Sequence, residues 1–195
     1  MITGKVTPEP LLLLALLVAA PVSLVAADLS LDRLMQQFAL ITTADARFRE
    51  EKQLALLETP LVVEGTLSYQ APDYLKKEVL TPEPSLFEIR GDSLHIEAGN
   101  EQRTLSLDSH PLIRAFAESY RAILSGNGTT LERYFDTELS GSIENWTLRL
   151  QPRDPQARDY IDAIIIRGSS GHIHSAETLE ASGDSTLMTI LPDHD

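Results

Sequence analysis

Two histidines form the most visible pattern for chemistry in this sequence. His172 and His174 are two residues apart in a predicted strand, so both side chains share a face and could supply two ligands to a zinc ion. No third ligand is indicated nearby. We interpret both as solvated positions beside the glycine-rich turn at 168–171, and we predict that they bind no metal.

Other catalytic patterns are weaker. The segment GSSG at 168–171 lacks the G-x-S-x-G spacing of a nucleophilic serine and leads into a strand. Pairs such as Asp154 with Asp159, or Glu177 with Glu180, resemble the two carboxylates of a glycosidase, but such pairs arise by chance among 29 acidic residues. The absence of cysteine excludes thiolate catalysis, disulfides and Cys-ligated metals. The residues taken by themselves therefore favour no particular class of enzyme.

The charge balance limits the possible partners. The 195 residues include 16 Lys and Arg against 29 Asp and Glu, which gives a net charge of −13. Binding to nucleic acid depends on clustered basic residues, so we expect no nucleic-acid partner. The length fits a single domain with one core.

The N-terminus has the layout of a secretory signal peptide. Lys5 precedes an unbroken apolar run from Leu11 to Ala20, and small residues follow at 25–27. The run is short for a membrane span, which takes about 20 apolar residues. We predict a signal peptide over residues 1–27 with cleavage after Ala27, and one exported domain over residues 28–195. An exported protein without disulfides fits the bacterial periplasm, and an uncleaved N-terminal anchor is the alternative.

The rest of the chain changes its hydrophobic period several times. Apolar residues recur at helical spacing over 30–42 and 111–125, and a short helix is predicted at 130–134. Elsewhere the period is two, with Gly, Pro, Asn and Asp turns between segments. Strands are predicted at 44–57, 63–69, 74–80, 85–90, 93–97, 103–107, 135–139, 145–150, 161–167, 172–179 and 185–191. About eleven short consecutive strands favour a mainly β, α+β domain whose antiparallel sheet curls into a sandwich or barrel.

The most informative features of the sequence are apolar. The 111–125 helix has a wide apolar stripe, and several strands carry apolar residues on one face. The chain has only five Phe, five Tyr and one Trp, so a curled sheet could keep a partly filled interior. An apolar interior gated by helices would suit an acyl chain. We predict that such a chain contacts Leu67, Tyr69, Leu112, Phe116, Tyr120, Trp146, Leu148, Ile164 and Ile166.

An ordered set of short motifs runs along nearly all of this domain. Ala46-Arg47-Phe48 precedes Glu51-Lys52, the sequence EGTLSY at 64–69 precedes Pro72, and WTLRLQP at 146–152 precedes Asp154. In this order the motifs resemble those of the LolA-type periplasmic lipoprotein carriers. The resemblance implies an incomplete antiparallel β-barrel closed by an N-terminal helix and a helical lid.

The resemblance also implies a function without a reaction and without a cofactor, so we expect a protein that is not an enzyme. Members of the family act as monomeric chaperones that receive the acyl chains of lipoproteins from an inner-membrane exporter complex. They pass them to an outer-membrane receptor. We therefore expect a periplasmic carrier of lipoproteins or another lipid. The alternatives are a ligand-sensing envelope regulator of the same fold and, less favoured, an exported metal-dependent hydrolase using the two histidines.

One position departs from the family pattern. Typical members have an arginine before the equivalent of Pro72, and that arginine holds the lid shut through hydrogen bonds to helix backbone. This sequence has Ala71 there, which has no side-chain donor. We expect either that another residue closes the lid or that the empty protein is more open.

Overall fold

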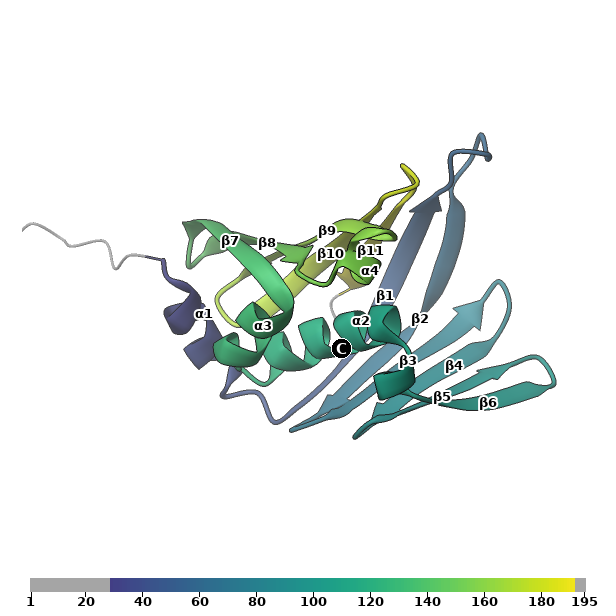
Figure 1. The fold of residues 1–195 in the computed structure, drawn as a ribbon, viewed down its shortest axis with the longest axis horizontal. Coiled ribbons are helices and arrows are strands. Elements are labelled where there is room, and N and C mark those ends of the chain that lie inside the picture. The colour runs from purple at the N-terminus through teal and green to yellow at the C-terminus, as the bar shows by residue number, and fades with distance from the viewer. Residues whose placement is uncertain (1–28, 192–195) are drawn as a thin grey trace, which may run out of the picture.

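A single antiparallel sheet dominates the computed structural model, which describes residues 29–191 (Figure 1). The predicted signal peptide at 1–27 lies outside these residues. In the first half of the chain the strands are β1 (Thr43–Gln53), β2 (Leu61–Gln70), β3 (Tyr74–Thr81), β4 (Ser85–Arg90), β5 (Ser93–Ala98) and β6 (Glu101–Ser106). In the second half they are β7 (Phe135–Ser142), β8 (Asn145–Pro152), β9 (Ile161–Ser169), β10 (His172–Glu180) and β11 (Ser185–Leu191).

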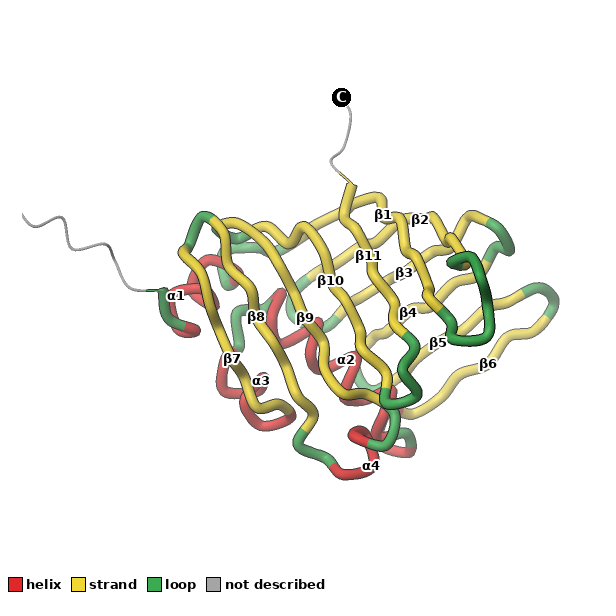
Figure 2. Tube along the Cα trace, turned by 90° about the horizontal axis from the view of Figure 1, so that it is seen from above, coloured by secondary structure: helices red, strands yellow, loops and turns green. Residues whose placement is uncertain are grey.

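The strand order is β6-β5-β4-β3-β2-β1-β11-β10-β9-β8-β7. Because β1 pairs with both β2 and β11, the first strand joins an N-terminal half of the sheet to a C-terminal half. β6 and β7 are the outer strands, so the sheet of the described residues is curled but not closed (Figure 2). The predicted mainly β fold with an incomplete barrel of eleven strands is confirmed.

The helices lie in the angle between the two halves of the sheet (Figure 1). They are α1 (Leu31–Phe38), the short 3-10 helix η1 (Leu107–Ser109), α2 (Pro111–Leu124), α3 (Gly128–Tyr134) and α4 (Pro155–Arg158). Ser30 caps α1 by accepting a hydrogen bond from the backbone of Arg33, and Pro111 occupies the first turn of α2. Gly126 ends α2 with a φ of +67°, as its type predicts.

Most element boundaries agree with the sequence within a few residues, but two expectations were wrong. The first strand ends at Gln53 rather than near Leu57, because residues 54–60 form the turn of a long hairpin. The first helix ends at Phe38 rather than Thr42, and the next residue that continues its apolar stripe, Ile41, follows a turn. The helices η1 and α4 were not predicted, because segments of three and four residues are too short to show a helical period.

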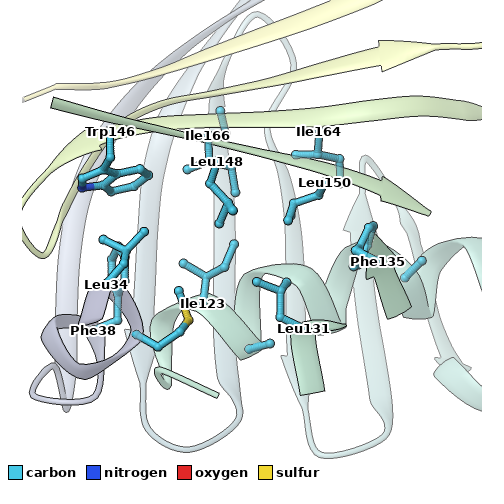
Figure 3. Close-up of a cluster of buried hydrophobic side chains, with 14 of the residues drawn as sticks. Leu34, Phe38, Ile123, Leu131, Phe135, Trp146, Leu148, Leu150, Ile164 and Ile166 are labelled. Atoms are coloured by element: carbon cyan, nitrogen blue, oxygen red, sulfur yellow. The ribbon is translucent and has the colours of Figure 1, made fainter. Parts of the chain in front are cut away.

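The largest core cluster fills the space between α1, α2 and α3 and the strands β7 to β10 (Figure 3). Trp146 is fully buried there, and its ring meets that of Phe38 edge to face with centroids 5.8 Å apart. The indole nitrogen of Trp146 donates to the carbonyl of Ser170 at 2.9 Å. Two smaller clusters lie on the N-terminal half of the sheet. The core is therefore built where the sheet curls around α2.

Candidate functional site

The inner face of the sheet follows from strand alternation and cross-strand pairing. Residues directly opposite each other in an antiparallel pair project to the same side. Phe48 on β1 lies opposite Gly65 on β2 and Ile190 on β11, and Gly65 lies opposite Val79 on β3. Phe48 and Val79 are buried in one small cluster, against which Ile190 packs. The same face carries Leu94 of β5, Leu148 of β8 and Ile166 of β9, and their clusters include residues of α2.

Six of the predicted lipid-contacting residues come together beneath α2. Trp146, Leu148, Ile164 and Ile166 are fully buried on β8 and β9 (Figure 3). Phe116 and Tyr120 of α2 are partly buried and pack against the same cluster. The apolar stripe of α2 is thus seated on these strands. In this structure the six side chains pack against other residues of the same core cluster.

The other three predicted residues lie apart from that cluster. Leu67 and Tyr69 are on β2, in the N-terminal half of the sheet, where Leu67 packs beside Phe48 and Val63. The Tyr69 hydroxyl is buried and has no hydrogen-bond partner among the described residues. Leu112 belongs to α2, but its side chain is outside the part that the structure describes. The predicted site is therefore divided between the two halves of the sheet.

Two pockets formed by described residues lie away from the predicted site. One, of about 270 Å³, lies near Gln151 and Asp162, and another, of about 360 Å³, lies between α2, α3 and α4. Neither is lined by a predicted lipid-contacting residue. Because α2 packs on β8 and β9, an acyl chain that occupies the space between them must displace the helix.

Arg121 fastens α2 to the sheet at its C-terminal end. The guanidinium is buried and donates to the backbone carbonyl of Asp73 from Nε at 3.1 Å and from Nη2 at 2.8 Å. It also donates to the carbonyl of Gly91. Asp73 and Gly91 belong to the β2–β3 and β4–β5 turns, so one side chain joins the helix to two hairpins. Its Nη1 lies 3.5 Å from Glu118, one turn earlier in α2.

This contact differs from the latch that the family resemblance implies. The family latch, as the resemblance implies it, runs from an arginine near the β2–β3 turn to helix backbone. Here the arginine is on the helix and the acceptors are backbone carbonyls of the turns. Little in the sequence indicates this contact, because a basic residue near the end of a helix is also common as a partner of the helix dipole.

The N-terminal end of α2 is fastened by charged groups. Arg114 Nη2 lies 2.5 Å from Asp92 Oδ1 and 2.6 Å from Asp108 Oδ1. Asp92 also accepts from the Ser106 hydroxyl at 2.9 Å. This hydrogen bond, followed by the bond and charge of Arg114, holds the pKa of Asp92 below its ordinary value. Both attachments of α2 are therefore polar and lie at the rim of the apolar face.

A charged group interrupts the inner face. Glu50 is only 3 % exposed, and its two carboxylate oxygens lie 2.5 Å from Lys77 Nζ and 3.4 Å from Lys52 Nζ. Burial, only partly offset by Glu50, holds the pKa of Lys77 below its ordinary value. Burial and the charge of Glu50 raise the pKa of Tyr120 to about 12. Tyr120 is therefore a neutral hydroxyl at physiological pH.

The predicted site did not include this charged group, although the strand pattern carries a signal for it. In the alternation of β1, Glu50 and Lys52 share the phase of the inward-facing Phe48. Charged residues are rarely buried without a partner, so a charged residue in the buried phase of a strand indicates a paired group there.

The two histidines are exposed and far from any cluster of ligands. His174 Nε2 lies 3.0 Å from the Ser169 hydroxyl. In residues 29–191 no three His, Cys, Asp or Glu side chains are grouped to hold a metal ion. That the histidines bind no metal stays a prediction. No described helix is both long and apolar enough to cross a membrane.

The amino-acid sequence matches a family described as outer membrane lipoprotein carrier protein LolA-like over residues 19–192. The chain belongs to this family. The match covers nearly the whole predicted exported domain and part of the predicted signal peptide. No curated protein matches the chain closely enough to count as a relative.

Several solved structures are similar to this LolA-like chain. A LolA superfamily protein from Nitrosomonas europaea is 8 % identical, with 86 % of this chain and 96 % of that chain covered and a TM-score of 0.46. A putative outer membrane lipoprotein-sorting protein domain from Vibrio parahaemolyticus is 10 % identical, with coverage of 83 % and 89 % and a TM-score of 0.45. The lipoprotein LppX from Mycobacterium tuberculosis is 14 % identical, with coverage of 83 % and 97 % and a TM-score of 0.39.

Proposed function

We propose that this LolA-like protein is a periplasmic carrier that binds acyl chains between α2 and the inner face of the sheet. It ferries a lipoprotein or another lipid from the inner to the outer membrane. The observation that carries the proposal is an apolar face on β8 and β9 covered by the apolar stripe of α2, a helix that is also held by polar bonds near its two ends. The family description supports the same function.

The energetics suit a carrier. Burial of an acyl chain contributes about 0.8 kcal/mol per CH₂ group, so one long chain gains roughly 10 kcal/mol from leaving water. Displacing α2 exposes the apolar side chains of Phe116, Tyr120 and the strands beneath them, and a bound chain covers that surface again. The carrier thus exchanges one apolar contact for another, and neither uptake nor release requires a chemical step.

The partners follow from this role. Cargo comes from an inner-membrane exporter complex and passes to an outer-membrane receptor, with the carrier as a monomer between them. The predicted signal peptide at 1–27 supports a periplasmic location. Fractionation of cells that produce the full chain tests this location, and retention of the chain in the cytoplasm would contradict it.

The test of the proposed function combines binding with transfer. A fluorescent fatty acid is titrated into the protein, and movement of a labelled lipid from donor to acceptor vesicles is followed with and without it. We expect saturable binding and faster transfer. Phe116→Asp places a charge against the apolar face and should weaken binding about ten-fold or more, whereas Phe116→Leu should bind nearly as wild type.

Two results would contradict the proposal. One is the absence of saturable binding of any acyl probe by the folded protein. The other is tight binding of lipid without any transfer to acceptor vesicles, which would leave a lipid-binding protein that does not act as a carrier. Mass spectrometry of lipids that copurify with the periplasmic form then identifies the cargo.

A further inference from the structure

The charged group on the inner face holds more positive than negative charge. Lys77 and Lys52 both approach the single carboxylate of Glu50, with Nζ to oxygen distances of 2.5 and 3.4 Å. Among residues 29–191 neither lysine has a second carboxylate within 4.0 Å. Two ammonium groups and one carboxylate leave one unit of positive charge on this face, in a protein whose net charge is −13.

A purely structural role explains this arrangement poorly. The side chains beside Glu50 on the same face are apolar, among them Phe48, Val63 and Val79. Replacing a buried ion pair by apolar residues of similar size is often neutral or stabilising, so stability alone does not call for charges here. The second lysine is still harder to explain, because one ammonium group already neutralises Glu50.

Both ammonium groups can be reached from solvent. The Glu50 side chain is 4 % exposed, but those of Lys77 and Lys52 are 27 % and 39 % exposed. Directly across the strands, Lys77 lies opposite Phe87 and Lys52 lies opposite Leu61. These two apolar side chains are 37 % and 42 % exposed. Accessible cations with an apolar surface beside them are complementary to a molecule that has an anionic head and an apolar chain.

We infer that Lys77 and Lys52 form a binding site for the anionic oxygen group, carboxylate or phosphate, of an amphiphile whose chain lies along the inner face. Glu50 holds the two ammonium groups toward one point, and the Phe48 ring, with its centroid 4.9 Å from Lys77 Nζ, supports one of them. Burial lowers the pKa of Lys77. Its ammonium group is reached by solvent only in part, so its charge is less screened and its bond to an anionic ligand is stronger than that of a fully exposed lysine. The inference rests on the proposed function and adds the class of ligand to it.

The test compares three probes that share one fluorescent C16 chain and differ in the head: a carboxylate, a phosphate and a methyl ester. We expect the wild type to bind at least one anionic probe about ten-fold more tightly than the ester. Lys77→Met should remove most of this preference and leave the affinity for the ester nearly unchanged. Lys76→Met is the matched control, because Lys76 is the neighbouring residue on the opposite face of β3 and pairs with Glu78.

Glu50→Gln separates a binding role from a structural one. The glutamine amide keeps an oxygen that accepts from the ammonium groups and removes only the competing negative charge, so the anionic probe should bind a few-fold more tightly while the affinity for the ester does not change. A merely structural role would weaken all three probes together. Whichever anionic head binds best identifies the source as a fatty acid or a phospholipid.

The possible failures are distinguishable. Equal affinity of the wild type for all three probes would overturn the headgroup site and leave the carrier intact. An unchanged preference for the anionic probe in Lys77→Met would also overturn it. Failure of every probe to bind would overturn the proposed function and this site with it.

Discussion

Arg121 joins the C-terminal part of α2 to two turns of the sheet. A guanidinium has five N–H donors in a fixed plane, so it can reach two backbone carbonyls at once. The carbonyls belong to Asp73 and Gly91, on two different hairpins. Because the acceptors are backbone carbonyls, the contact does not depend on the side chains of the two turns. Of the residues that form it, only Arg121 must keep its side chain.

Arg121→Leu should therefore loosen the lid without removing its apolar packing. We expect a loss of about 2–3 kcal/mol of stability, since hydrogen bonds to charged groups contribute about 1.5–3 kcal/mol each and are partly replaced by water. Uptake of a fluorescent fatty acid in stopped-flow measurements should become several-fold faster, because the open form is more populated. The exposed Arg103 provides the control variant Arg103→Leu. Unchanged uptake by Arg121→Leu would show that this contact does not limit opening.

Gly65 is a second residue with a specific structural task. A Cβ at this position would lie 1.9 Å from the carbonyl oxygen of Glu78 and 2.9 Å from a ring carbon of Phe48. Only glycine therefore lets the Phe48 ring lie across β2 toward Lys77. Gly65→Ala should lower the free energy of unfolding by about 1–3 kcal/mol through overpacking.

A denaturation curve in urea checks this expectation. Gly171→Ala serves as the matched control, because the nearest atom to its added Cβ would be 3.5 Å away, at the carbonyl oxygen of Gln37. That variant should stay within about 0.5 kcal/mol of the wild type. Equal stability of the two variants would mean that the backbone of β2 and β3 yields easily at Gly65.

At the scale of elements, the attachment of the N-terminal end of α2 to the sheet includes a carboxyl group whose charge depends on pH, that of Asp92. Asp92 accepts from Ser106 and pairs with Arg114, and these contacts lower its pKa in the folded protein. A lowered carboxyl pKa stabilises the folded state at pH values above the ordinary value of 3.8. This contribution disappears as the pH falls through the lowered pKa, where the folded protein also binds the proton.

Asp92→Asn should therefore be less stable than the wild type at pH 7, and the difference should shrink as the pH falls below 3.8. Thermal unfolding measured from pH 7 down to pH 2.5 follows this difference. Ser106→Ala removes the largest cause of the lowered pKa, so it should show a smaller effect of the same shape. A stability gap of constant size over the whole range would contradict the assignment.

At the scale of the whole molecule, the sequence predicted the sheet well and the site only in part. Alternating residues and turn signals located eleven strands, because period-two patterns and Gly or Pro turns are local properties of the chain. The same pattern grouped Trp146, Leu148, Ile164 and Ile166 on one face, as the structure does. It also placed Phe116 and Tyr120 on the apolar stripe of α2.

What the sequence did not predict depends on tertiary contacts. Arg121 bonds to Asp73 and Gly91, which precede it in the chain by 48 and 30 positions. Lys77 follows its partner Glu50 by 27 positions. Such contacts leave no periodic signal. The expectation of an interior open to an acyl chain also depended on how closely α2 packs, which composition does not determine. The described structure has α2 seated on the strands beneath it.

The proposed function therefore requires the molecule to open by moving α2, and this movement can be blocked. Ala117 of α2 is buried in a small cluster with Leu94 of β5 and Leu107. The chain contains no cysteine, so Ala117→Cys combined with Leu94→Cys gives one defined pair of thiols. A short reducible cross-linker should hold α2 on the sheet and abolish uptake of a fluorescent fatty acid, and a reductant should restore it. The two single-cysteine variants, treated in the same way, should take up the probe normally. Uptake at the normal rate by the cross-linked protein would mean that lipid binds elsewhere, and that α2 is a fixed part of the core.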